Sequence, residues 1–332
     1  MPEDASPPGQ QPFERAARTP TASQLRCAVR DRLRAAGIET ADVEAGLLVA
    51  EALGVTPAEL ALAPQPNDEQ VARVAAWTHR RAEREPLQHL LGWAGFRRLT
   101  LAVGPGVFIP RPETEVLVEA ALAALSERAQ ASSDPGQPVV VGGAEGQVRV
   151  AVDLCAGSGA VALALADECP GLTVYAVERE PAAFAWLRRN VEGHREQCDR
   201  RGSRVCASRQ DVCDPGLLAE LRGSVDVVVS NPPYIPDDCV PRNPEVADYD
   251  PPAALFGGSD GLDVVRCVVQ RAAELLCSGG TVAIEHGELQ GATAPADVHT
   301  VAVLLSEAGG FDAIRTLTDL TGRPRVTVAT RA

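Results

Sequence analysis

The sequence has few aromatic residues, no Cys-x-x-Cys pair and no excess of positive charge. Its nine cysteines are scattered and lack a His-x-x-x-His partner motif, so we expect reduced thiols that fill small core spaces and no metal site. Thirty-one basic residues against 45 acidic ones leave a net charge of −14. This balance disfavours direct binding to nucleic acid, which needs clustered Lys and Arg.

The sequence also lacks a signal peptide and a long apolar run, which predicts a cytoplasmic protein without a membrane partner. It does have 332 residues, 45% of them apolar, enough for one large domain and a smaller one. Residues 1–20 are rich in Pro, Gln and Ala without periodicity, and we expect a disordered leader there.

Residues 21–85 predict a small helical bundle, because apolar residues recur at helical spacing between glycine, proline and capping-box signals. The predicted helices begin near Leu25, Thr40, Thr56 and Asn67, and Pro86 ends the last one. A bundle of this size is too short for chemistry of its own, so we expect it to dock a protein partner.

A β-hairpin linker is predicted within residues 86–110. Apolar residues alternate with others over 99–103, and the turn 104–106 would lead into a second strand at 107–109. The hairpin would join the bundle to a large domain, residues 111–332.

The large domain alternates strands and helices, which specifies an α/β fold with a mostly parallel sheet covered on both faces. Its first helix is expected from Glu113 to about Gln130, followed by a surface loop over 134–146. Seven strands are expected at Val148–Asp153, Leu172–Val177, Arg204–Ala207, Val225–Ser230, Thr281–His286, Asp312–Leu317 and Arg325–Ala329.

A glycine turn after the first of these strands predicts a ligand-binding loop. Gly157 and Gly159 stand where a strand passes into a helix and the backbone can approach a ligand. Glu178 ends the second strand, about 20 residues on, where an acid can bind ribose hydroxyls. The full G-x-G-x-x-G pattern is missing, so a nucleoside without phosphate, such as S-adenosylmethionine, fits better than a dinucleotide.

Two aspartates are candidates for the same site. Asp153 ends a central strand and needs a partner such as the methionine ammonium or an N–H of the glycine loop. Asp211 could accept a hydrogen bond from the adenine amino group or cap the turn before Pro215, and the sequence leaves both roles open. His286 has no triad or metal-ligand partners and is interpreted as structural.

The segment Asn231-Pro232-Pro233-Tyr234 directly follows a buried strand and predicts the place of chemistry. The Asn231 side-chain oxygen and the Pro232 carbonyl could accept both N–H groups of a planar amide, while Tyr234 covers one face and attracts a sulfonium methyl. In-line methyl transfer to that nitrogen would then need alignment and no strong base. A proline-stiffened turn is the alternative.

These motifs resemble the release-factor glutamine N5-methyltransferase family, class I S-adenosylmethionine-dependent enzymes with a Rossmann-like seven-stranded sheet. The resemblance covers about residues 22–332 and rests on PLQHLLGWAGF, FIPRPETE, VDLCAGSGA, NPPYIP, DPPAALFGGSDGLD and TGRPRVTVA. It implies methyl transfer from S-adenosylmethionine to the side-chain amide nitrogen of the glutamine in the Gly-Gly-Gln motif of peptide chain release factors.

The motifs and the resemblance together assign residue roles. Cofactor contacts are expected from Asp153, Cys155, Ala156, Gly157, Ser158, Gly159, Glu178, Asp211, Val212 and Asn231. Substrate contacts are expected from Asn231, Pro232, Pro233, Tyr234, Ile235 and Phe96, with Asn231, Pro232 and Tyr234 catalytic.

Three departures from the family pattern concern the cofactor site. Cys155 replaces a glycine, which is tolerable only if its φ stays below zero. Val212 stands where some relatives have an aromatic residue near the adenine. Insertions near 134–146 and 193–203 would alter loops around the cofactor.

Other functions share parts of this pattern. The substrate could be a ribosomal-protein glutamine, although the PRPETE segment favours a release factor. Amino methylation of a nucleic-acid base uses a similar acceptor motif but would want a basic track on the surface. A non-enzymatic S-adenosylmethionine-binding adaptor would not require both Asn231 and Tyr234.

Overall fold

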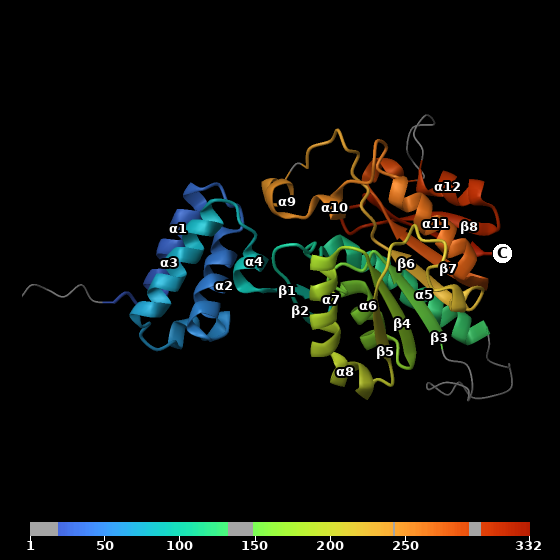
Figure 1. The fold of residues 1–332 in the computed structure, drawn as a ribbon. Coiled ribbons are helices and arrows are strands. Elements are labelled where there is room, and N and C mark those ends of the chain that lie inside the picture. The colour runs from blue at the N-terminus through green and yellow to red at the C-terminus, as the bar shows by residue number, and fades with distance from the viewer. Residues whose placement is uncertain (1–18, 132–148, 242, 292–299) are drawn as a thin grey trace, which may run out of the picture. The chain divides into compact units, whose positions relative to one another are not determined.

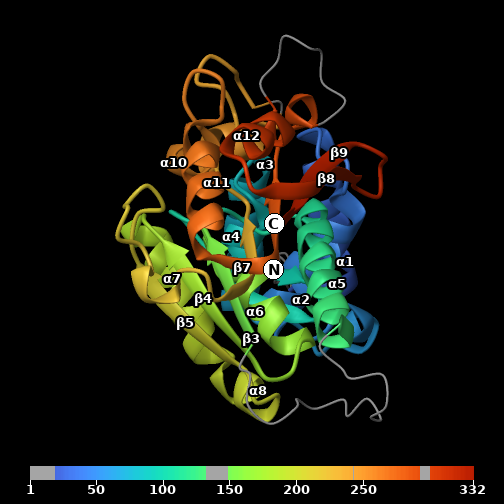
Figure 2. The ribbon, with the colours of Figure 1, turned by 90° about the vertical axis from the view of Figure 1, so that its right-hand side faces the viewer.

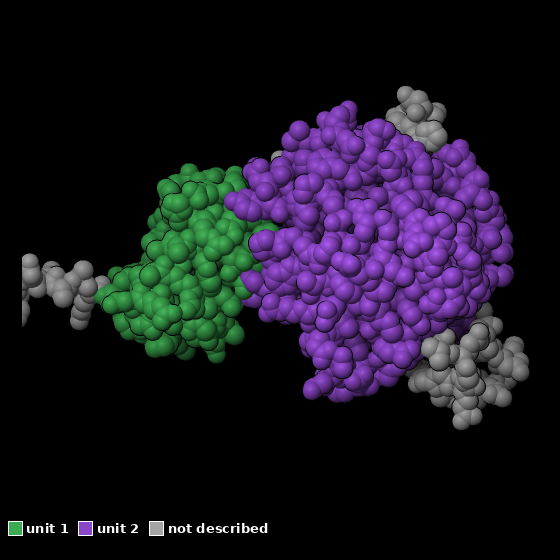
Figure 3. Space-filling model, viewed as in Figure 1, with its two compact units in different colours: residues 1–91 green, residues 92–332 purple. Residues whose placement is uncertain are grey.

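The computed structural model describes residues 19–131, 149–241, 243–291 and 300–332. The predicted loop 134–146 lies outside them, and so does the predicted leader apart from residues 19 and 20. The chain divides into two compact units, Met1–Leu91 and Gly92–Ala332, coloured green and purple in Figure 3.

The first unit is helical, as predicted. It contains α1 (Ala22–Ala35), α2 (Ala41–Leu53), the 3-10 helix η1 (Pro57–Leu62), α3 (Asp68–Ala82) and α4 (Leu87–Leu91). The helix α4 was not predicted, and it extends the unit beyond the expected boundary at residue 85. Leu90 of α4 packs into the same core as Leu33 and Leu48 of the earlier helices, so it belongs to this unit.

The second unit combines a hairpin, a seven-stranded sheet and surrounding helices (Figure 1). Its strands are β1 (Trp93–Phe96), β2 (Leu99–Ala102), β3 (Arg149–Leu154), β4 (Leu172–Glu178), β5 (Arg204–Arg209), β6 (Val225–Ser230), β7 (Leu276–Glu285), β8 (Phe311–Thr318) and β9 (Pro324–Arg331). Its helices are η2 (Pro112–Thr114), α5 (Glu115–Ala131), α6 (Ala160–Glu168), α7 (Pro181–Gly193), α8 (Arg195–Arg200), η3 (Ala219–Leu221), α9 (Pro244–Tyr249), α10 (Pro252–Leu255), α11 (Asp263–Leu275), η4 (Glu288–Gln290) and α12 (Val301–Ala308).

The hairpin lies one strand earlier than predicted. It pairs β1 with β2, whereas residues 103–109 form no strand. Pro105 has no N–H to give to a strand ladder. A Cβ on Gly104 would lie 2.7 Å from the Trp186 ring, so this stretch packs as a loop against α7.

The seven-stranded sheet confirms the predicted α/β class. Its strand order is β5-β4-β3-β6-β7-β9-β8. The strands β3 to β7 run parallel, β9 is antiparallel to β7, and β8 is antiparallel to β9. The fifth predicted strand begins earlier than expected, at Leu276 instead of Thr281, and ends at Glu285.

Helices cover both faces of this sheet because side chains alternate along each buried strand. Ala151, Val227 and Ala283 point to the core shared with α5 and α6, while Val152 and Val228 point to the core shared with α11 and α12. Figure 2 shows α5 and α11 on opposite sides of β7. Because β3, β4 and β6 run parallel, the turns at their carboxyl ends lie together at one end of the sheet, where open α/β sheets bind ligands.

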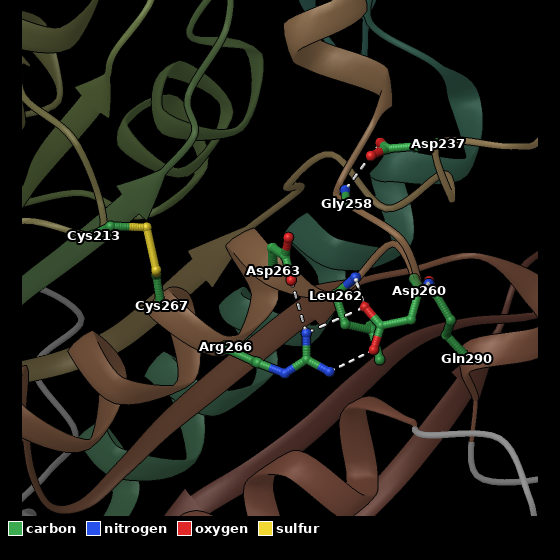
Figure 4. A network of polar contacts seen from close by, with 9 residues as sticks. All are labelled: Cys213, Asp237, Gly258, Asp260, Leu262, Asp263, Arg266, Cys267 and Gln290. Atoms are coloured by element: carbon green, nitrogen blue, oxygen red, sulfur yellow. Dashed lines mark hydrogen bonds and ion pairs between the residues drawn. A yellow bond between two sulfur atoms is a disulfide. The ribbon is translucent and has the colours of Figure 1, made fainter.

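The cysteines correct part of the sequence analysis. Cys213 and Cys267 form a disulfide across 54 residues, with Cα atoms 5.0 Å apart (Figure 4). Sequence spacing could not reveal this pair, because the loop after β5 meets α11 only in the fold. Cys198 is buried as expected, on the helix α8 that forms the predicted insertion near 193–203, whereas Cys239 and Cys27 are exposed.

Candidate functional site

A cavity of about 760 Å³ opens at the carboxyl ends of the central strands, wholly within the second unit. Its wall includes most of the residues predicted for the site. These are Asp153, Cys155, Ala156, Gly157, Ser158, Glu178, Asp211, Val212, Asn231, Pro233, Tyr234 and Ile235. A volume of this size suits a ligand of nucleoside dimensions.

The glycine turn between β3 and α6 supplies one end of the cavity. Gly157 and Gly159 have φ of +55° and +86°, a region that residues with a Cβ rarely adopt. A Cβ on Gly157 would meet nothing within 4 Å, so its backbone faces open space. A Cβ on Gly159 would lie 2.7 Å from Leu187 of α7, so this glycine serves close packing and does not line the cavity.

Cys155 contradicts the expectation drawn from its replacement of glycine. Its φ is +64°, in the left-handed region, and not below zero. This conformation costs a residue with a Cβ roughly 1–2 kcal/mol, so the turn geometry overrides the side chain. Burial raises the pKa of the Cys155 thiol, which keeps it protonated and unreactive.

Two buried carboxyls flank the turn. Asp153 Oδ2 accepts a hydrogen bond from Ala162 N in the first turn of α6 at 3.0 Å, a partner other than the two that the sequence suggested. Burial raises the pKa of Asp153 to about 8, and the nearby Glu178 adds to this rise. A cation at this end of the cavity would relieve both effects.

Glu178 holds the turn from the neighbouring strand. Its Oε2 accepts from Gly157 N at 2.9 Å and its Oε1 from Glu180 N at 2.7 Å. Burial raises the pKa of Glu178, while these backbone N–H groups favour its charged form. Each carboxylate oxygen keeps a second lone pair, so Glu178 can still accept from hydroxyl groups of a ligand.

The loop after β5 forms the next part of the wall. Asp211 caps its own turn, because its Oδ1 accepts from Cys213 N at 2.9 Å. Its Oδ2 also lies 3.5 Å from Arg179 Nη1. Of the two roles left open, the turn cap is the one observed, and Asp211 still lines the cavity beside Val212.

The NPPY segment forms the opposite end. Asn231 Nδ2 donates to Thr114 Oγ1 at 3.3 Å, and no hydrogen bond to Asn231 Oδ1 is found among the described residues. The Pro232 side chain is buried and does not line the cavity, and its carbonyl has no partner among the described residues. Asn231 therefore offers an unpaired acceptor in the cavity wall, and the Pro232 carbonyl is a second unpaired acceptor next to it in the chain.

Tyr234 also lines the cavity. Burial raises the pKa of Tyr234 to about 12, with a smaller contribution from Glu285, and Arg325 opposes the rise as a hydrogen-bond partner. The phenol is therefore neutral and anchored by its polar end. Its apolar face remains for a ligand.

Phe96 does not lie where its predicted contact with the substrate requires it. Its side chain is 2% exposed and packs in the core with Leu99 and Leu117, away from the cavity wall. As part of β1 it points inward with the other apolar residues of the hairpin. Phe108 is the phenylalanine that lines the cavity, with the Arg111 guanidinium 5.1 Å from its ring centre.

Arg111 joins two segments that lie far apart in the sequence. Its Nη2 bonds Asp250 Oδ2 at 2.7 Å, and the Asp250 side chain is fully buried. Burial raises the pKa of Asp250, and Arg111 opposes that rise. Sequence reasoning used both segments to recognise the family but did not foresee this ion pair.

The glycine-rich segment after α10 holds the NPPY segment through close backbone contacts. A Cβ on Gly257 would lie 2.6 Å from the Pro233 carbonyl oxygen, and one on Gly261 would lie 2.3 Å from that of Tyr234. Gln290 Nε2 adds a hydrogen bond to the Tyr234 carbonyl at 3.0 Å. Only glycine permits these approaches, which explains the spacing of the motif.

Polar contacts close the same segment on itself (Figure 4). Gly258 N donates to Asp237 Oδ1 at 3.2 Å, and Arg266 pairs with both Asp260 and Asp263. None of these residues lines the cavity, so their contacts hold the segment after α10 without occupying the site.

His286 has the structural role that was predicted. It is fully buried, with Nε2 2.9 Å from Thr327 Oγ1 and Nδ1 2.8 Å from the Gly287 carbonyl. Burial lowers the pKa of His286 to about 4, so the ring is neutral at ordinary pH. Glu285, the residue before it, was missed by the sequence analysis and lies beside the NPPY segment.

Two features of the structure bear on membrane and metal binding. None of the helices within the described ranges is both long and apolar enough to cross a membrane. In the same part of the chain, no cluster of three or more His, Cys, Asp or Glu side chains could hold a metal ion.

Comparisons with known proteins agree with this geometry. Residues 24–92 match the family described as PrmC N-terminal domain, and residues 130–241 match the methyltransferase small domain. A release factor glutamine methyltransferase of Mycolicibacterium smegmatis is 44% identical over 90% of this chain and 94% of its own length. One from Bifidobacterium longum is 41% identical over 89% and 94%.

A further relative has a different name. The 4-amino-L-phenylalanine/4-methylamino-L-phenylalanine methyltransferase of Streptomyces pristinaespiralis is 36% identical over 84% of this chain and 88% of its own length. The relatives named for release factors match at higher identity and over more of the chain. On the fold, the cavity and these identities, the chain belongs to the release factor glutamine methyltransferase family.

Proposed function

We propose that this protein methylates the side-chain amide nitrogen of the glutamine in the Gly-Gly-Gln motif of peptide chain release factors, using S-adenosylmethionine. One observation carries the proposal. The cavity has a glycine turn with two buried acids at one end and the Asn231 side chain at the other. The Asn231 side-chain oxygen and the carbonyl of the next residue, Pro232, have no partner among the described residues. A primary amide brings two N–H donors that match two acceptors.

The glycine-turn end fits S-adenosylmethionine on its own chemistry. Gly157 offers open space beside its backbone, and Glu178 retains acceptor lone pairs for ribose hydroxyls. Asp153 is a buried carboxyl that a ligand ammonium would stabilise. Asp211 and Val212 would lie along the adenine. When bound, the cofactor supplies an electrophilic methyl group on a sulfonium.

The NPPY end would prepare the acceptor nitrogen. An amide nitrogen is a weak nucleophile because its lone pair is delocalised into the carbonyl. Asn231 Oδ1 and the Pro232 carbonyl would accept its two protons, fix its plane and stabilise the positive charge that develops on it. The Tyr234 ring would cover one face, and the proton would leave afterwards to water.

The cavity described above lies wholly within the second unit, and we propose that the helical first unit docks the release factor. Surface substitutions there should raise KM for a whole release factor and leave KM for a short Gly-Gly-Gln peptide unchanged. A parallel rise for both substrates would contradict the docking role.

The deciding experiment is mass spectrometry of a release factor incubated with this protein and S-adenosylmethionine. We expect one added methyl group, on the glutamine of the Gly-Gly-Gln motif. Parallel reactions with a ribosomal protein, a nucleic acid and 4-amino-L-phenylalanine test the alternatives. Methylation of any of these at a higher kcat/KM than the release factor would overturn the assignment.

A further inference from the structure

A buried carboxyl beside the NPPY segment has no role in the steps above. Glu285 is the last residue of β7, is 2% exposed, and its Oε2 has no hydrogen-bond partner among the described residues. Ser230 of β6 pairs in register with Ile284 of β7. The residues that follow them, Asn231 and Glu285, are therefore neighbours at the edge of the cavity.

Thr114 completes this group from the segment before α5. Its hydroxyl oxygen accepts from Asn231 Nδ2 at 3.3 Å. Thr114 and Asn231 both lie close enough to the Glu285 carboxyl to lower its pKa as polar neighbours. A carboxamide has two N–H donors. Thr114 takes one of those on Asn231, and the unpaired Glu285 carboxyl is the acceptor group beside the other.

We propose that Glu285 is a positioning residue which, with the Thr114 hydroxyl, holds the Asn231 carboxamide with its nitrogen turned into the protein and its oxygen toward the cavity. The inference rests on the proposed function, because the orientation matters only for a ligand that brings N–H donors.

Such a device is needed because the oxygen and nitrogen of a carboxamide have nearly the same size. Packing alone cannot select one orientation, whereas hydrogen-bond partners can. A flipped Asn231 would present N–H donors to the N–H donors of a substrate amide, and the two would repel. Glu285 as a carboxylate is an acceptor only and rejects that flip.

The charge of Glu285 should depend on pH within the working range. Burial raises the pKa of Glu285 to about 7, and Glu113 adds to the rise, while Thr114, Arg325 and Asn231 oppose it. Tyr234 and the adjoining His286 stay neutral from pH 6 to 8 and add no charge change of their own. Protonated Glu285 would donate to the Thr114 oxygen and compete with Asn231 for it.

The first test compares Thr114→Val with Thr114→Ser. Valine keeps the shape and removes the hydroxyl, and an unpaired buried group costs about 1–3 kcal/mol, so kcat should fall roughly 10- to 100-fold. Serine keeps the hydroxyl and should retain kcat within about threefold. Thr327→Val, at a buried threonine that bonds His286, is the matched control and should leave kcat unchanged at temperatures where it is folded.

The second test asks which way Asn231 faces. A peptide with glutamate in place of the methylated glutamine offers acceptors instead of donors, and it should inhibit the wild type weakly. In Thr114→Val the Asn231 amide loses one of the two groups that orient it and populates the flipped orientation more, so inhibition by the glutamate peptide should strengthen relative to binding of the glutamine peptide. A change in stability alone would not alter this ratio.

The third test follows kcat against pH in Glu285→Gln. The wild type should lose kcat as pH falls from 8 to 6, because the acceptor carboxylate is lost as Glu285 binds a proton. The variant should have a lower kcat that does not fall further between pH 8 and 6, and an unchanged Kd for S-adenosylmethionine. The Thr114 variants provide the same information should Glu285→Gln fold poorly.

The outcomes separate the two levels of the hypothesis. A wild-type protein that does not methylate a release factor overturns the proposed function and this inference with it. A wild type that methylates, together with a folded Thr114→Val of undiminished kcat and unaltered peptide preference, overturns this inference alone.

Discussion

The two ends of the cavity are built in different ways. At the glycine-turn end, the key hydrogen bonds join residues 9 and 21 positions apart, Asp153 to Ala162 and Gly157 to Glu178. At the NPPY end, the Asn231–Thr114 bond spans 117 positions. The first end is a local strand–turn–helix structure that one motif can encode. The second exists only when three distant segments meet, so its parts are recognisable separately and its geometry is not.

The largest expected effect comes from breaking the NPPY end alone. Asn231→Ala removes a preorganised acceptor, and kcat should fall roughly 10²- to 10³-fold. Calorimetry on the same variant should find the Kd for S-adenosylmethionine changed much less, because the glycine-turn end is intact. A variant with near-full turnover would refute the catalytic role of Asn231.

The disulfide is an exception to the local character of the glycine-turn end. It fixes the loop carrying Asp211 and Val212 to α11 across 54 residues. Replacing Cys213 and Cys267 by serine should lower the free energy of unfolding by about 2–4 kcal/mol, measured by urea titration. Cys239→Ser, at an exposed free cysteine, is the control. Equal free energies of unfolding for the oxidised and reduced wild type would show that the disulfide does not stabilise the fold.

Glu178→Ala tests whether the local end binds cofactor independently. Hydrogen bonds to a charged group are worth about 1.5–3 kcal/mol, so Kd for S-adenosylmethionine should rise roughly 10- to 100-fold in calorimetry. Glu192→Ala, at an exposed glutamate of α7, should leave Kd unchanged. Equal affinity of Glu178→Ala and wild type would remove Glu178 from the cofactor site.

The smallest expected effect is on the free energy of unfolding, and it comes from backbone strain in the glycine turn. Cys155→Gly should raise the free energy of unfolding by about 1 kcal/mol, because glycine accepts the φ of +64° without strain. Gly157→Ala should act in the opposite direction, since it strains the backbone at φ +55° and places a methyl group in the cavity. Equal stability of Cys155→Gly and wild type would mean that lost packing offsets the relief.

The spacing of apolar residues, together with the glycine, proline and capping residues between the elements, was enough to predict the α/β class, the seven strands and the helical first unit. Each of these signals depends on residues close together in the chain, such as Gly157 and Gly159 in the turn before α6, because short-range backbone geometry is encoded locally. Hairpin placement failed because Gly104 and Pro105 resemble a turn, while contact with Trp186 of α7 keeps that stretch irregular.

Only the tertiary structure decided which side chains meet. Phe96 packs in the core, and Phe108 lines the cavity in its place. Cys213 bonds to Cys267, and Thr114 and Glu285 lie beside Asn231. These contacts depend on strand order and register, which bring remote segments within hydrogen-bond distance. No local spacing carries that information, because the energy that selects each contact comes from packing the whole sheet and its helices.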